Sequence, residues 1–152
     1  MTRNALVIAV LALLLAILGV LGYKLSPRPA TADEMLAVSA CDPGVQACTV
    51  ALVGGGQIEL AIEPRPVRPL QALDLSIRIT GLEARQIELD FGGRDMQMGY
   101  NRPVLAGADG RFTGRTTLPV CVSGSMVWIV TALVTMDSGR VAIPFRFTVA
   151  GR

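Results

Sequence analysis

The sequence predicts an all-β fold: an immunoglobulin-like antiparallel β-sandwich of about seven strands, preceded by one N-terminal transmembrane helix. Three observations predict it. Residues 5–23 form an uncharged apolar run, segments that alternate apolar and polar residues recur from residue 47 to residue 149, and turn residues separate these segments about every 8–12 positions. No amphipathic helix pattern interrupts them. An OB-type barrel is the second fold that such a pattern permits.

Residues 5–23 are expected to cross a membrane. A helix of this length, without a charge or a proline, spans roughly 28 Å, which is close to the hydrocarbon thickness of a bilayer. Tyr23 and Lys24 are residue types that favour the membrane interface. The small-residue motif at 30–32 and the lipobox-like sequence that ends at Cys41 lie well beyond the apolar run, so neither reads as a cleavage site. We therefore expect an uncleaved anchor.

The chain is expected to divide at this anchor. Residues 1–4 form a cytoplasmic N-terminus, residues 5–23 the transmembrane anchor, residues 24–40 a proline-containing tether, and residues 41–152 an extracytoplasmic β-sandwich domain. Basic residues flank the anchor on both sides, so their count alone is close to a tie. The cysteines and the strand-rich C-terminal part favour the periplasm. The prediction is a single-pass protein of the bacterial inner membrane with its C-terminal domain in the periplasm.

The first strands follow from turn signals and alternation. Residues 47–52 and 57–63 are strand-like segments, and three consecutive glycines at 54–56 between them indicate a hairpin. Residues 64–69 contain three prolines and must leave the sheet or run along its edge. Residues 73–79 and 86–91 alternate cleanly, which is typical of half-buried antiparallel strands. Their inward residues are predicted to be Leu73, Leu75, Ile77, Ile79, Ile87, Leu89 and Phe91.

Three further strands are expected in the second half. Asp109 and Gly110 form a turn before residues 111–118. Residues 126–136 are nearly all apolar or β-branched, which predicts a central strand covered on both faces, with Trp128 in the core. A turn at 137–139 closes a hairpin onto residues 141–149, which alternate again.

Composition argues against an enzyme. The chain has no histidine, so it lacks the usual general base, the usual partner of a Ser or Cys nucleophile and the commonest zinc ligand. The formal net charge is only +2, and several basic residues flank the anchor, which leaves no electrostatic footprint for nucleic acid. No paired carboxylates and no phosphate-binding glycine loop are evident. We expect no catalytic residues and no nucleic-acid partner.

Two of the three cysteines should pair in an extracytoplasmic domain. Cys41 and Cys48 bracket Asp42-Pro43-Gly44, a turn that could bring them together. A Cys48–Cys121 pair would instead join the first strand to the loop before the Trp128 strand. The sequence does not choose between these pairings.

Sulfur-containing residues form the one candidate metal site. Met96 and Met98 flank Gln97, so both point the same way in an extended segment, and Met126 follows Cys121 by five residues. Thioether and thiolate ligands select Cu(I). Met96, Met98, Cys121 and Met126 are therefore candidate Cu(I) ligands. The alternative is that these methionines fill gaps in the core.

The second half of the chain contains a series of short motifs, at residues 91–99 (FGGRDMQMG), 101–105 (NRPVL), 110–112 (GRF), 118–121 (LPVC) and 126–128 (MVW). These motifs resemble those of YtkA-like and FixH-type membrane-anchored periplasmic domains, and the resemblance spans roughly residues 57–149. It implies a short sandwich with one membrane anchor, associated with haem-copper oxidase assembly or copper handling. By matching position it carries over Met96 and Met98, with Cys121 and Met126 as looser additions.

Two functions follow as expectations. The first is a membrane-anchored extracytoplasmic accessory protein that assists respiratory oxidase assembly or Cu(I) handling. The second is a structural or protein-interaction β-sandwich module of the cell envelope that binds no metal. The corresponding partners are the membrane and a respiratory oxidase or another envelope protein.

Overall fold

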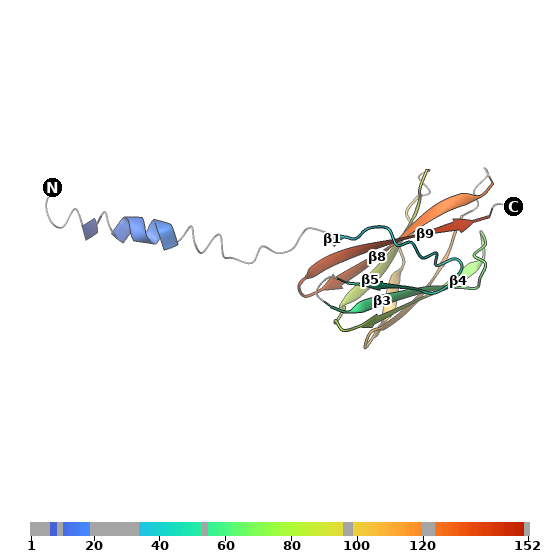
Figure 1. Ribbon diagram of the computed structural model, residues 1–152, viewed down its shortest axis with the longest axis horizontal. Helices are drawn as coiled ribbons and strands as arrows, with labels where there is room; N and C mark the ends of the chain where they lie inside the picture. The colour runs from blue at the N-terminus through green and yellow to red at the C-terminus, as the bar shows by residue number, and fades with distance from the viewer. Residues whose placement is uncertain are drawn as a thin grey trace.

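The computed structural model describes residues 7–8, 11–18, 34–52, 55–95, 99–119 and 124–150 (Figure 1). Residues 7–8 and 11–18 are helical, and the rest of the described chain is built from strands and turns. Within these residues, no helix combines the length and the apolar character needed to span a membrane. Residues 5–6, 9–10 and 19–23 of the expected anchor lie outside the described residues, and the anchor stays a prediction.

The described residues contain nine strands, and the prediction of a mostly antiparallel β fold is confirmed. Their bounds are β1 Glu34–Met35, β2 Cys48–Ala51, β3 Gln57–Glu63, β4 Ala72–Thr80, β5 Gln86–Gly93, β6 Val104–Ala108, β7 Arg111–Thr117, β8 Met126–Met136 and β9 Gly139–Val149. Every pairing is antiparallel except that of β1 with β9. Seven of the nine match expected segments. The other two, β1 and β6, were not expected.

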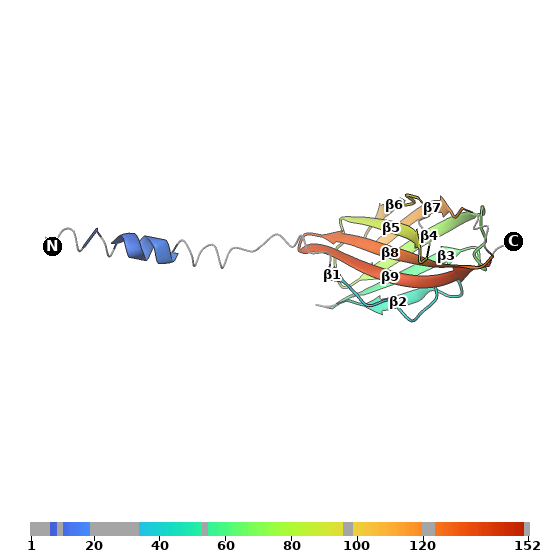
Figure 2. The ribbon, with the colours of Figure 1, turned by 90° about the horizontal axis from the view of Figure 1, so that it is seen from above.

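The strands form one continuous hydrogen-bonded order, β1-β9-β8-β5-β6-β7-β4-β3-β2. The corner is β6, because Val104 and Leu105 pair with β5, whereas residues 106–108 pair with β7. Figure 2 shows β6 and β7 at one margin of the domain and β2 at the other. The close approach at the corner requires a glycine, since a Cβ on Gly107 would lie 2.7 Å from the Cα of Phe112. The sheet therefore curls and has two ends, β1 and β2.

One apolar core fills the inside of the curled sheet. The side chains of β4 alternate strictly between exposed and buried, and the expected inward residues of β4 and β5 are all buried. Trp128 is buried with them, as predicted, and no polar or charged residue of the described chain is buried. Burial of each such side chain contributes about 1.5–3 kcal/mol. The core thus accounts for the alternation of apolar and polar residues in the sequence.

The strand expected to be central is central. β8 lies between β5 and β9, and each of its residues from Trp128 to Thr135 pairs with both neighbours. Its inward residues are buried, but on the outer face only Leu133 is buried, whereas Val127, Ile129, Thr131 and Thr135 are half-buried. The expected cover on both faces is therefore only partly present. Residues 64–71 connect β3 to β4 outside the ladder, as their prolines predict.

Candidate functional site

The predicted sulfur site can be placed at only one of its four residues. Met96, Met98 and Cys121 lie outside the described residues. Met126 is the first residue of β8, pairs with Val149 and is only 8% exposed. Its side chain belongs to the apolar core, as the alternative interpretation of the methionines predicts for this residue. Within the described part of the chain, no group of three or more His, Cys, Asp or Glu side chains could hold a metal ion.

The described residues nearest to the other candidates lie at one end of the sheet. Gly93 at the end of β5 pairs with Trp128 near the start of β8, and the Arg94 N–H donates to the Val127 carbonyl at 3.0 Å. Asp95 and Gly124 each lie within two residues of these strand ends in the chain. The described stretches that flank residues 96–98 and 120–123 therefore meet at the same end of β5 and β8.

Asn101 joins the two halves of the curled sheet near this end. Its carbonyl accepts from the Phe91 N–H in β5 at 2.9 Å. Its side-chain Nδ2 donates to the Thr117 carbonyl in β7 at 3.0 Å, and its Oδ1 accepts from the Thr116 hydroxyl at 2.8 Å. Sequence reasoning missed this role, because a lone asparagine in a loop shows nothing of the strands beside it.

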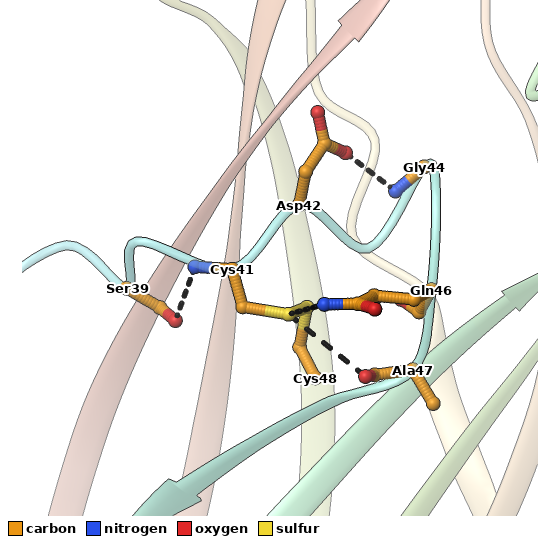
Figure 3. Close-up of a disulfide and its surroundings, with 7 residues drawn as sticks. All are labelled: Ser39, Cys41, Asp42, Gly44, Gln46, Ala47 and Cys48. Carbon is orange, nitrogen blue, oxygen red and sulfur yellow. Dashed lines mark hydrogen bonds between the residues drawn. A yellow bond between two sulfur atoms is a disulfide. The ribbon is translucent and has the colours of Figure 1, made fainter.

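The disulfide joins Cys41 to Cys48, with their Cα atoms 5.7 Å apart (Figure 3). This is the first of the two pairings that the sequence left open. Cys48 is fully buried and Cys41 is half-buried. The loop between them also has bonds of its own: Asp42 Oδ1 accepts from the Gly44 N–H at 2.7 Å, and the Asp42 carbonyl accepts from two further amides at 3.1 Å. Such turns are typical of an Asp followed by Pro and Gly.

The disulfide connects the two ends of the strand order. The segment before it runs along β9, where the Leu36 and Ser39 amides donate to the Ala142 and Pro144 carbonyls at 3.0 and 2.9 Å. Cys48 begins β2, at the opposite end of the order. Among the described residues, no backbone ladder joins β2 to β1 or β9. The sulfur–sulfur bond therefore closes the open side of the curled sheet covalently.

The outer face of β5 carries two ion pairs. Arg102 contacts Asp90 at 2.7 Å and Arg140 contacts Glu88 at 2.8 Å. The hydrogen bond to Asp90 raises the pKa of the Arg102 guanidinium further above its usual range, and this guanidinium also lies 5.5 Å from the centre of the Tyr100 ring. Each carboxylate is thus neutralised by an arginine. The two ion pairs are neighbours, because Glu88 and Asp90 are two residues apart on the same face of β5.

Two surface hollows lie on the described part of the domain. One of about 290 Å³ lies beside the disulfide loop and β9, and its lining includes Asp42, Arg94 and Arg146. Another of about 590 Å³ lies between the residues around Leu82 and the β6–β7 turn. Neither lining contains a cysteine or a methionine. These hollows do not extend the candidate metal site.

Comparison of the sequence with models of known protein families and with curated proteins found no match.

Proposed function

We propose that this chain is a membrane-anchored accessory protein of the bacterial inner membrane. Its periplasmic immunoglobulin-like domain assists the assembly of a respiratory oxidase and binds Cu(I) transiently. The observation that carries the extracytoplasmic part is the Cys41–Cys48 disulfide, since such bonds persist in oxidising compartments. The apolar run at residues 5–23 supports the anchor, and the antiparallel strands around Trp128 support the sandwich.

The copper part of the proposal rests on Met96, Met98 and Cys121. These residues supply two thioethers and one thiol, which are soft ligands suited to Cu(I). The described strand ends that flank them meet at one end of the domain, which supports a shared site. We exclude Met126 from the proposed Cu(I) ligands, because its side chain packs in the core.

Titration of the full chain with Cu(I) against a chromogenic Cu(I) chelator tests this part. Replacing both Met96 and Met98 with Leu should weaken Cu(I) binding by at least about tenfold, because two of three soft ligands are lost. Met126→Leu is the matched control and should leave the affinity unchanged, since Leu and Met have similar volumes in a core. Equal Cu(I) affinity of the wild type and the double variant would remove copper from the proposal.

The second candidate function is a protein-interaction module of the envelope that binds no metal. The burial of Met126 favours it, because one of the four predicted ligands is used for packing. Under this function, a pull-down from solubilised membranes recovers the same envelope partner with the wild type and with the Met96→Leu, Met98→Leu variant, whether or not copper is present. Under the copper function, the double variant loses Cu(I) binding and fails to restore the oxidase content of membranes from which the gene is deleted.

A further inference from the structure

Residues 34–47 form a strap that runs along the edge of β9 before the chain enters β2 at Cys48. The amides of Leu36 and Ser39 donate to β9 carbonyls at 3.0 and 2.9 Å. β9 offers one ladder donor fewer on this side, because Pro144, whose carbonyl accepts from Ser39, has no N–H. The strap is therefore joined to the sheet by a sparse ladder.

Few side chains of the strap help to hold it. Its only strand, β1, is two residues long. Met35, Val38 and Val45 are 73%, 53% and 72% exposed, so these large apolar side chains gain little from burial. Pro43 is the one buried residue among residues 35–47. The disulfide at the end of the strap is thus its main attachment to the domain.

One sulfur of this disulfide can be reached from outside. Cys48 is fully buried, whereas Cys41 is half-buried, and the side-chain Nε2 of Gln46 lies 3.6 Å from the Cys41 sulfur in an exposed contact (Figure 3). Disulfide exchange begins with a thiolate that attacks an accessible sulfur. Cys41 is therefore the point of attack, and Cys48 is the leaving group.

We propose that a dithiol reduces the Cys41–Cys48 bond and thereby releases the strap, while the rest of the described domain stays folded. A thiolate of the dithiol bonds to Cys41 Sγ, the sulfur–sulfur bond breaks, and Cys48 leaves as a thiolate that takes up a proton. The second thiolate of the dithiol then attacks the mixed disulfide, and Cys41 leaves in the same way. Two electrons pass to the two cysteines, and the dithiol becomes a disulfide.

The rest of the domain keeps its own contacts after this step. β9 pairs with β8 along all eleven of its residues, and none of these pairs involves the strap. Cys48 pairs with Leu60 and lies in the apolar core, where a free thiol behaves as a small apolar group. Release is thus local.

A released strap lengthens the connection that precedes the domain. Residues 34–47 span up to roughly 45 Å when extended. The domain would then reach further from the membrane in the reduced state than in the oxidised state. This consequence rests on the proposed anchor. The release itself depends neither on the anchor nor on copper.

Amide hydrogen exchange of the full chain in detergent micelles, with and without dithiothreitol, tests the release. The Cys121→Ser variant is used, so that only the paired cysteines change. After reduction, the Leu36 and Ser39 amides should exchange at least about tenfold faster, close to the rate of an unstructured peptide. The amides of Leu89 and Phe91 in β5 are the control and should stay at least about a hundredfold slower than such a peptide.

A second variant reaches the same state without a reductant. Cys41→Ser in the Cys121→Ser background cannot form the disulfide and should show the fast exchange at Leu36 and Ser39 from the start. Protection of these two amides in the reduced chain or in this variant would overturn the proposal, because the strap would then hold without the bond. Loss of protection at Leu89 and Phe91 as well would also overturn it, since reduction would then unfold the whole domain.

Discussion

The hydroxyl of Thr116 in β7 donates to Oδ1 of Asn101 at 2.8 Å, and the Asn101 carbonyl accepts from Phe91 in β5, so Asn101 links two strands that share no ladder. β6 pairs with β5 at residues 104–105 and with the first part of β7 at residues 106–108. The part of β7 after Thr113 therefore has no ladder neighbour on the side of β6. Asn101 replaces the missing ladder, because its backbone bonds to β5 and its side chain to β7. One side chain thus closes the gap that the corner strand creates.

Asn101→Ala should lower the free energy of unfolding by about 1–3 kcal/mol, because it removes two hydrogen bonds and leaves the Thr117 carbonyl without its partner. Urea unfolding followed by fluorescence measures this, since Trp128 is the only tryptophan and is buried. Thr113→Ala on the same strand is the control and should change stability by less than about 0.5 kcal/mol.

A double-mutant cycle should show that Asn101 and Thr116 act together. Thr116→Val should cost less in the Asn101→Ala background than in the wild type, by about 0.5 kcal/mol or more. Additive losses would mean that the contact between the two side chains contributes nothing to stability.

Replacing Cys41 and Cys48 together with Ser should destabilise the domain by about 2.5 kcal/mol, because the disulfide closes a short loop in the unfolded chain. The cysteines are seven positions apart, so the loop is small and the effect moderate. Urea unfolding of the oxidised wild type and of the double variant measures the difference. A wild type treated with reductant should match the variant, and a variant as stable as the oxidised wild type would contradict the clamping role.

The same disulfide predicts how many thiols react. Alkylation of the denatured chain followed by mass spectrometry should add one group without reductant and three groups after reduction, since the chain has three cysteines. Protein retained in the cytosol by removal of residues 1–23 should take up three groups without reductant, because that compartment keeps thiols reduced. A disulfide in the cytosolic form would weaken the extracytoplasmic assignment.

Gly110→Ala should be among the more damaging single-methyl additions, with a loss of about 2 kcal/mol or more. Gly110 has a φ of 73°, and a Cβ there would collide with the Ile79 carbonyl, while its own carbonyl accepts from the Ile79 N–H at 2.7 Å. Gly55→Ala is the matched control: its φ is 94° but nothing lies within 4 Å of the added Cβ. The control should therefore lose only the conformational part, about 1 kcal/mol. Equal losses of stability in the two variants would show that the collision with the Ile79 carbonyl does not contribute to the effect of Gly110→Ala.

The ion pair between Arg102 and Asp90 should contribute little to stability. Both side chains are about one-third exposed, at 31% and 36%, so solvent and salt screen the attraction. Asp90→Asn should cost less than about 1 kcal/mol in low salt, and less again in 1 M salt, where the Debye length falls to about 3 Å. A loss that persists unchanged in high salt would indicate a packing role for Asp90.

Local patterns made seven strands predictable: alternation in most of them, a hairpin turn signal for residues 47–52 and a nearly continuous apolar run for residues 126–136. Leu73, Leu75, Ile77 and Ile79 all face the core as their spacing of two requires. β6 escaped prediction because only Leu105 among its five residues is buried, so it shows no alternation. β1 was not predicted, because a strand of two residues is too short to show an alternation of apolar and polar residues. Both are strands only because neighbouring strands offer them partners.

The candidate site was predictable only as a set of residue types. Soft sulfur ligands could be recognised in the sequence, but Met126 proved to be a core residue once β8 was placed against β9. The turn at Asp42-Pro43-Gly44 was a local signal for the Cys41–Cys48 pair, yet Cys121 remained an equal alternative. Asn101 gave no signal, because its partners lie in strands distant in the chain.

The sequence by itself determined the all-β class, the inward faces of the main strands, the central position of β8 and the lack of histidine chemistry, since these follow from local period and composition. The tertiary structure alone decided the strand order, the corner at β6, the disulfide partner, the Asn101 bridge and the strap along β9. Those features depend on which strands become neighbours. Neighbours are selected by the shape of the shared core and by non-local hydrogen bonds, which no local pattern encodes.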